Sequence, residues 1–149
     1  MDRISKEKRS QNMAAIKNRN TKPEMMIRRW LFARGYRFRV NVDYIPGHPD
    51  LYFRKYNTAI FVHGCYWHRH TGCKYAYTPK SNQSFWIPKF SSNVKRDAEI
   101  KRVLIEKGIN CIVIWECTLK KMARNTEFRD EALDEMEKCL RGNSSYTEF

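Results

Sequence analysis

The alternation of hydrophobic and polar positions indicates a group of strands in the middle of the chain. Residues 36–40 (YRFRV) alternate, residues 50–53 (DLYF) follow the turn sequence PGHP, and residues 57–64 (NTAIFVHG) are mostly apolar. Short segments of this kind, bounded by turn residues, are typical of strands. Residues 109–116 (INCIVIWE) form an almost continuous apolar run, which predicts a fourth strand that is buried on both faces of a sheet.

Three further segments have helical spacing and helical end signals. Residues 21–35 begin with Thr21 and Glu24 in capping-box spacing and end at a glycine. Residues 91–108 begin with serine N-cap candidates and also end at a glycine, and residues 128–140 repeat an apolar residue at every fourth position. The predicted order of elements is therefore α-β-β-β-α-β-α, which places the chain in the α/β class.

The charge of the chain indicates a polyanionic partner. There are 29 Lys and Arg residues against 16 Asp and Glu residues, which gives a formal net charge of +13. Each phosphate that such cations neutralise releases a condensed counterion, so nucleic acid is the first candidate partner. An anionic membrane surface is the competing candidate, but the sequence has no long apolar run and no signal-like start. We therefore expect a cytoplasmic protein that does not contact a membrane.

The chain is expected to form one domain over residues 1–149. Its length and its hydrophobic fraction of 42% are sufficient for a single core. The strongly basic residues 1–20 predict a weakly amphipathic helix or arm that lies on a polyanion, and a solvated leader is the alternative. Residues 141–149 are expected to form a polar tail.

Cysteine and histidine residues are concentrated in one loop. Cys65, His68, His70 and Cys73 lie within nine positions, and Cys117 follows the predicted buried strand. These side chains are typical zinc ligands, and zinc needs four of the five. The local four would form a small knuckle, whereas a set that includes Cys117 would tie the loop to the sheet. Scattered thiols and surface imidazoles are the alternative, and burial alone explains the other two cysteines.

Asp50 is a candidate ligand for a hard cation. It follows the Pro-Gly turn at the entrance of a predicted strand, where a carboxylate can face a cleft while the strand behind it stays buried. Mg²⁺ prefers carboxylate and carbonyl oxygens and keeps several waters for a phosphate substrate. An Asp after a Pro is also common as a plain turn residue.

Several motifs together resemble one enzyme family. PDLYF and IFVHGCYWHRHTGC, with SFW, NVKRD and VIWEC downstream, are similar to the motifs of the very short patch repair (Vsr) DNA mismatch endonucleases, in the restriction-endonuclease-like superfamily. The likeness extends from about Lys6 to about Leu140. It implies a restriction-endonuclease-like central mixed β-sheet that is flanked by helices and carries a structural zinc-binding loop.

The chain departs from the wider superfamily at its second metal-binding position. The usual acid-x-Lys triplet is replaced by Ile60, Phe61, Val62 and His63, none of which has a side chain that can hold magnesium. The resemblance implies instead that Asp50 and the main-chain carbonyl of Val62 hold the Mg²⁺. It also implies a structural Zn²⁺ with these ligands: Cys65, His70, Cys73 and Cys117.

The same resemblance assigns the remaining polar residues of the site. His68 would be the general base, Asp97 would orient its imidazole, and His63 would lie against the scissile phosphate. Glu24 is implied near the metal, although its capping-box position offers a complete structural explanation as well. The histidine run varies within the family, so the choice of His70 over His68 as the zinc ligand is an expectation that needs a direct test.

Three aromatic residues are candidates for DNA intercalation. Tyr66 and Trp67 lie on the cysteine-rich loop and Trp86 lies in SFW. Core packing explains any one of them singly, but in the family aromatic residues at these positions insert beside a T:G mismatch. The implied reaction is a nick on the 5′ side of the mismatched thymine, in T:G pairs formed by deamination of 5-methylcytosine. We expect a nucleoid-associated monomer, with double-stranded DNA as substrate and mismatch-repair factors as candidate partners.

Two other functions are compatible with the composition. One is a zinc-stabilised nucleic-acid-binding module that does not cleave, and the other is a structural zinc protein with a basic surface. The set formed by Asp50, His63, His68 and Asp97 favours the nuclease, because a protein that only binds does not need carboxylates and imidazoles beside a zinc loop.

Overall fold

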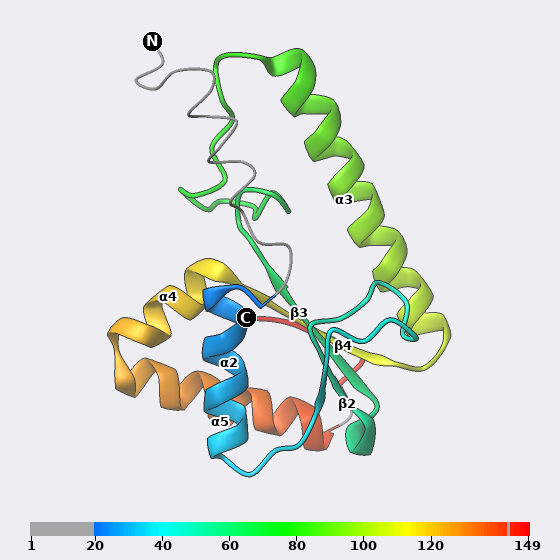
Figure 1. The fold of residues 1–149 in the computed structure, drawn as a ribbon, viewed down its shortest axis with the longest axis vertical. Coiled ribbons are helices and arrows are strands. Elements are labelled where there is room, and N and C mark those ends of the chain that lie inside the picture. The colour runs from blue at the N-terminus through cyan, green and yellow to red at the C-terminus, as the bar shows by residue number, and fades with distance from the viewer. Residues whose placement is uncertain (1–19, 143) are drawn as a thin grey trace.

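A computed structural model describes residues 20–142 and 144–149, and it contains a five-stranded mixed sheet flanked by helices (Figure 1). The strands lie in chain order across the sheet: β1 (Arg39–Val40), β2 (Leu51–Phe53), β3 (Thr58–His63), β4 (Asn110–Trp115) and β5 (Tyr146–Glu148). β2 is antiparallel to β1 and β3, whereas β4 is parallel to β3 and β5. The predicted mixed sheet is confirmed, and so are the three successive strands before the long helix.

Helices cover both faces of this sheet. They are α2 (Lys22–Ala33), α3 (Gln83–Glu106), α4 (Glu116–Arg124) and α5 (Thr126–Gly142), with a 3₁₀ turn η1 (Arg54–Tyr56) between β2 and β3. α2, α4 and α5 pack on one face, and the C-terminal half of α3 packs on the other. The N-terminal half of α3 and the loop after β3 project beyond the end of the sheet (Figure 1). None of the described helices is both long enough and apolar enough to span a membrane.

The alternation of side chains along β4 explains its apolar sequence. Ile112 and Ile114 pack against α2, α4 and α5, whereas Cys111, Val113 and Trp115 face the side of α3. All six residues of β4 are buried, which confirms the predicted strand with two covered faces. The parallel neighbour β3 pairs His63 with Trp115. Both rings therefore lie at the C-terminal ends of adjacent parallel strands, on the α3 side.

The predicted first helix is confirmed as α2. The Thr21 hydroxyl accepts a hydrogen bond from the Glu24 backbone N–H at 3.4 Å. The Glu24 carboxylate accepts from the Asn20 backbone N–H at 2.8 Å, one residue before the partner that a capping box would use. At the other end Gly35 has φ +94°, and this left-handed conformation after a helix favours glycine.

Three expectations about the elements need correction. The helix predicted at 91–108 begins earlier, at Gln83. Its first turns were not predicted because Pro88 lies inside them, and a proline lacks the N–H donor that a helix interior needs. Stacking of Trp86 on Phe90 supports these turns. α4 is a helix that the sequence did not indicate, since it starts directly at the end of β4 without a turn signal. The predicted arm at 1–20 lies outside the described residues except for Asn20.

The expected polar tail at 141–149 is the third correction. Residues 141 and 142 still belong to α5, and Tyr146–Glu148 form β5. The Trp115 N–H donates to the Phe149 carbonyl at 2.9 Å, and the Phe149 N–H donates to the Val113 carbonyl at 2.8 Å. A polar edge strand pairs through its backbone, so its side chains carry little signal of the pairing. The end of the chain therefore completes the sheet beside β4.

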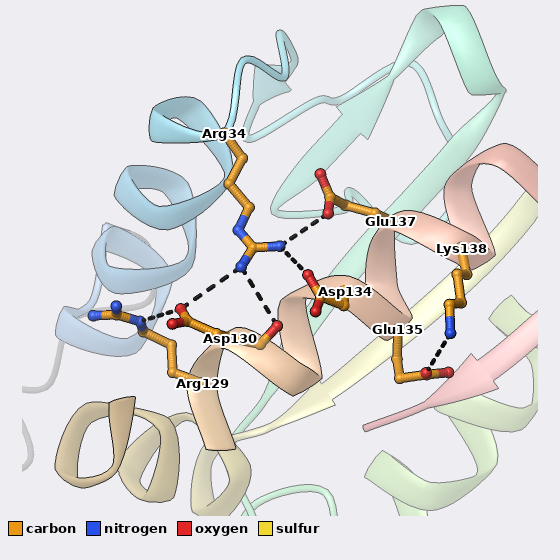
Figure 2. Close-up of polar contacts among 7 residues, drawn as sticks. All are labelled: Arg34, Arg129, Asp130, Asp134, Glu135, Glu137 and Lys138. Carbon is orange, nitrogen blue, oxygen red and sulfur yellow. Dashed lines mark hydrogen bonds and ion pairs between the residues drawn. The ribbon is translucent and has the colours of Figure 1, made fainter. Parts of the chain in front are cut away.

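Arg34 joins α2 to α5 at the surface (Figure 2). Its guanidinium contacts Asp134 at 2.6 Å, Glu137 at 2.9 Å and Asp130 at 3.6 Å, three carboxylates on successive turns of α5. We expect Arg34→Ala to lower the free energy of unfolding by about 1 kcal/mol, because a network on a partly buried cation is worth more than an isolated surface pair. Thermal or urea unfolding measures this change.

The matched control is Lys138→Ala on the same helix. Lys138 pairs only with Glu135 among the described residues, and both side chains are largely exposed, at 74% and 61% (Figure 2). We expect its loss to change stability by less than about 0.5 kcal/mol. Equal effects of the two substitutions would show that the Arg34 network does not hold α2 against α5.

Candidate active site and metal centre

A cleft of about 960 Å³ opens at the C-terminal ends of β3 and β4. It is lined by all five residues with a predicted catalytic role: Glu24, Asp50, His63, His68 and Asp97. They come from α2, the turn before β2, the end of β3, the following loop and α3. These five places thus meet at one end of the sheet, beside the C-terminal ends of parallel strands, which commonly present ligand-binding groups.

His68 and Asp97 form a short hydrogen bond across the cleft. The His68 Nδ1 N–H donates to Asp97 Oδ2 at 2.6 Å. This contact fixes the ring orientation and leaves Nε2 as the basic nitrogen. The His63 ring stacks on the His68 ring with 3.9 Å between centroids and an interplanar angle of 5°. Burial and, after it, the neighbouring His68 lower the pKa of His63 to about 3, so the His63 ring is neutral at physiological pH.

Asp50 and Glu24 place two carboxylates close together beside the end of β3. Glu24 is only 5% exposed, and Asp50 Oδ2 accepts a hydrogen bond from the Val62 backbone N–H at 2.7 Å. Burial raises the pKa of Asp50, the hydrogen bond from Val62 opposes this rise, and the Glu24 carboxylate adds to it. Arg28 lies 3.5 Å from Glu24 and compensates part of the negative charge. Such a pair of carboxylates favours a bound cation.

A second group contains four possible ligands for a soft metal and is separate from the group of His63, His68 and Asp97. The ligand atoms of Cys65, His70, Cys73 and Cys117 all lie within 4.8 Å of one another, and Cys117 Sγ is 3.4 Å from His70 Nδ1. Tetrahedral zinc–sulfur and zinc–nitrogen bonds separate neighbouring sulfur and nitrogen ligands by roughly 3.5 Å. The donor set therefore fits a four-coordinate soft metal. His68 lies outside this group and belongs with His63 and Asp97.

The start of α4 contributes to the same four-ligand group. Cys117 is the second residue of α4, and its backbone N–H donates to Cys65 Sγ at 3.4 Å. Helix N-termini and backbone N–H groups stabilise thiolates. Burial raises the pKa of Cys65 to about 12, so a thiolate there needs a nearby cation. A bound metal ion would supply that positive charge.

Trp115 joins the two groups, a role that the sequence did not reveal. Its indole stacks on the His70 ring at 4.1 Å and meets the His63 ring edge-on at 5.3 Å. The indole N–H donates to Glu148 Oε1 on β5 at 3.2 Å. Trp115 is 8% exposed, so this partner satisfies a nearly buried donor. The only signal in the sequence is the alternation along the strand, which places Trp115 on the same face of β4 as Cys111 and Val113.

The three predicted intercalating residues form one aromatic cluster beyond the sheet. The Tyr66 ring centroid lies 5.1 Å from that of Trp67 and 5.7 Å from that of Trp86. The cluster rests on Phe90, which is buried and stacks against Trp86. Asn93 on α3 donates to the Trp67 carbonyl at 3.0 Å and so attaches the loop to the helix. All three residues are half-buried.

An imidazole held by a carboxylate, next to paired carboxylates in the cleft of a strongly basic protein, is the arrangement expected of a hydrolase that acts on a polyanion. Comparison with known proteins identifies that class further. The family model of the DNA mismatch endonuclease Vsr matches residues 1–74. The chain is 39% identical to the DNA mismatch endonuclease Vsr of Escherichia coli over 85% of this chain and 79% of that protein.

Two nicking enzymes are similar to the same extent. The type II nicking enzyme V.NmeAIP of Neisseria meningitidis is 41% identical over 82% of this chain and 86% of its own length. The type II nicking enzyme V.XorIIP of Xanthomonas oryzae pv. oryzae is 39% identical over 81% of this chain and 88% of its own length. The chain belongs to the Vsr family of DNA mismatch endonucleases, and it is a DNA endonuclease.

Proposed function

We propose that this endonuclease nicks one strand of double-stranded DNA on the 5′ side of the thymine in a T:G mismatch, in a reaction that requires Mg²⁺. The relatives named above are mismatch and nicking endonucleases, which supports the cleavage of one strand at a mispair. The observation that carries the proposal is the hydrogen bond between His68 and Asp97 in the cleft that also contains Asp50. A protein that only binds DNA has no need of such a set.

The residues that would hold the Mg²⁺ are Asp50 and the carbonyl of Val62. The Val62 N–H donates to Asp50, and the N–H and C=O of one strand residue point to the same edge of the strand, so the Val62 carbonyl points to the edge of β3 on which Asp50 lies. Glu24 is near enough to Asp50 to act through water while its other contacts cap α2. When bound, Mg²⁺ supplies Lewis-acid stabilisation of negative charge on the phosphate.

His68 would act as the general base. With Nδ1 hydrogen-bonded to Asp97, its Nε2 can take a proton from a water molecule as that water attacks phosphorus. The bond from phosphorus to the 3′ oxygen then breaks. The 3′ oxygen takes a proton from solvent and becomes a 3′-hydroxyl, and the phosphate stays on the 5′ end of the downstream strand. His63 is neutral and stacked on His68, where it can donate a hydrogen bond to a phosphate oxygen without adding charge.

Zinc at the four-ligand group would have a structural role. Its ligands come from the loop after β3 and from α4, so a bound ion would fix the loop that carries His68, Tyr66 and Trp67. Binding free energy at such sites is folding free energy. His68 and His70 can then serve different purposes although only one residue separates them.

The aromatic cluster supports a mechanism for finding the mismatch. Tyr66, Trp67 and Trp86 could insert into the base stack, where a mispaired step costs less to open than a Watson–Crick step. Because Phe90 and α3 support the cluster from behind, the rings are organised before DNA arrives. We also propose a restriction-endonuclease-like fold in a single domain, a monomeric enzyme, and a location on the bacterial nucleoid that follows from its DNA substrate.

A nicking assay tests this function. End-labelled duplexes that contain one T:G mismatch, in a series of flanking sequences, are compared with duplexes that have a T:A pair at the same position. Each is incubated in Mg²⁺ and in EDTA. We expect one nick 5′ of the mismatched thymine, only in Mg²⁺, with ends that a DNA ligase can reseal. Binding without cleavage in every context would instead support the non-cleaving module, and cleavage of T:A duplexes at the same rate would rule out mismatch recognition.

A further inference from the structure

Arg69 lies at the centre of the loop that carries the aromatic cluster. Its Nη1 donates to the carbonyl oxygens of Tyr66 at 3.2 Å and Tyr77 at 3.0 Å. Its Nη2 donates to the carbonyl oxygen of Ala76 and to the hydroxyl of Thr78, both at 2.9 Å. One guanidinium thus bonds to four acceptors in two segments that the sequence separates by ten residues.

The face of the same guanidinium packs on aromatic rings. Arg69 Cζ lies 3.9 Å from the ring centroid of Phe90 on α3 and 5.7 Å from that of Tyr66. Cation–π contacts at these distances are favourable. Arg69 also has φ +55°, a backbone conformation that non-glycine residues adopt only when their surroundings hold them there. The side chain therefore connects the loop, the segment 76–78 and α3.

The charge of Arg69 is not used in an ion pair with any carboxylate of the described residues, and the side chain borders the cleft beside His68. Its hydrogen bonds go to neutral acceptors instead. A lysine could keep the positive charge at this place, but a single ammonium cannot reach acceptors on both sides of the loop as the planar fork of arginine does.

We propose that Arg69 is a positioning residue for mismatch recognition: its four hydrogen bonds and its contact with Phe90 hold Tyr66 and Trp67 in the arrangement that inserts into DNA. The inference rests on the proposed function because it assumes that the cluster enters the base stack. It goes further by assigning the geometry of the cluster to one cation that does not itself touch the reacting atoms. Loss of the fork would misplace the rings while leaving the charge of the cleft intact.

The experiment separates the fork of Arg69 from its charge. Arg69→Lys keeps the charge and Arg69→Gln removes it. 2-Aminopurine beside the mismatched thymine reports unstacking, single-turnover nicking reports the reaction, and titrations at several salt concentrations report binding. Hydrogen–deuterium exchange of residues 66–78 in the free protein reports the order of the loop without any DNA. Arg102→Lys is the control, because Arg102 bonds only to Glu99 and Glu106 on its own helix among the described residues.

For Arg69→Lys we expect faster exchange over residues 66–78, a smaller 2-aminopurine change and nicking slowed by roughly tenfold or more, while affinity falls by less than about threefold. Unchanged exchange and nicking in this variant would overturn the proposal. So would a loss in Arg69→Gln that is confined to affinity, with a salt slope reduced by about one, since that result describes a simple phosphate contact. Zinc content and thermal unfolding confirm that each variant is folded.

A milder variant covers the case in which Arg69→Lys does not fold. Thr78→Val removes one of the four acceptors and leaves the arginine in place, and we expect smaller shifts in the same direction in exchange and in 2-aminopurine signal. No shift in either would contradict the proposal. If the wild-type enzyme does not nick T:G duplexes or unstack the mismatch, the proposed function itself fails, which is a separate result from wild-type activity that Arg69→Lys retains.

Discussion

Asp50→Asn is expected to lower the rate of nicking by at least about a thousandfold and to leave DNA binding nearly unchanged. Asparagine keeps an oxygen that can accept the Val62 N–H at the position where Asp50 now accepts it at 2.7 Å. It removes the negative charge that a divalent cation requires. Because the charge next to Glu24 also disappears, the variant is expected to unfold at no lower temperature than the wild type. Single-turnover nicking and differential scanning calorimetry measure the two effects.

Asp43→Asn is the matched control for this substitution. Asp43 belongs to the same connection between β1 and β2 but is exposed. We expect it to nick at the wild-type rate within about twofold, as surface substitutions away from a site usually do. Asp50→Asn with more than about a tenth of wild-type activity would show that Asp50 does not hold the metal, and equal losses in both variants would point to an effect of net charge.

The second large effect is expected from Cys117→Ser. The proposed zinc would lose the ligand that ties the loop to α4, and binding free energies of structural zinc, about 10–16 kcal/mol in small zinc domains, are comparable to the stability of a whole domain. We therefore expect loss of bound zinc and a largely unfolded loop, with nicking and DNA binding lost together. Metal analysis by mass spectrometry and the dispersion of the NMR spectrum measure this outcome.

Cys139→Ser controls for the loss of a thiol. Cys139 is half-buried on α5, outside both metal-ligand groups of the described residues, and its Sγ contacts the Thr147 hydroxyl at 3.7 Å, a contact that serine can replace. We expect this variant to bind one zinc ion and to nick normally. If Cys117→Ser binds zinc as tightly as Cys139→Ser does, Cys117 is not a ligand, and the local loop must complete the site without it.

The central strands and the first and last helices could be predicted because their signals are local. β4 is apolar throughout since both of its faces are covered, and α2 carries its own cap and terminal glycine. Five candidate ligands could be named from the sequence because four of them lie in one loop and Cys117 directly follows the buried strand. The resemblance then selected His70 over His68. The structure brings these four together, and their metal remains a proposal.

The other features depend on contacts between distant segments. β5 was missed because a polar edge strand is recognised through its backbone pairing with β4. Pro88 hid the first turns of α3, which Trp86 and Phe90 support through stacking. Arg69 has no signal in its neighbours either, since its acceptors lie at residues 66 and 76–78 and its aromatic contact lies on α3. Contacts of this kind can be identified only from the folded structure.

The division of one loop between a metal centre and an active site is the claim on which the mechanism depends. His68 belongs with His63 and Asp97, and His70 belongs with the three cysteines. Measurement of zinc content and T:G nicking in His68→Ala and His70→Ala tests it directly. We predict that His68→Ala stays folded with one zinc ion but nicks at least about a hundredfold more slowly, whereas His70→Ala loses zinc. Loss of zinc from His68→Ala, with zinc retained in His70→Ala, would contradict the assignment of both residues.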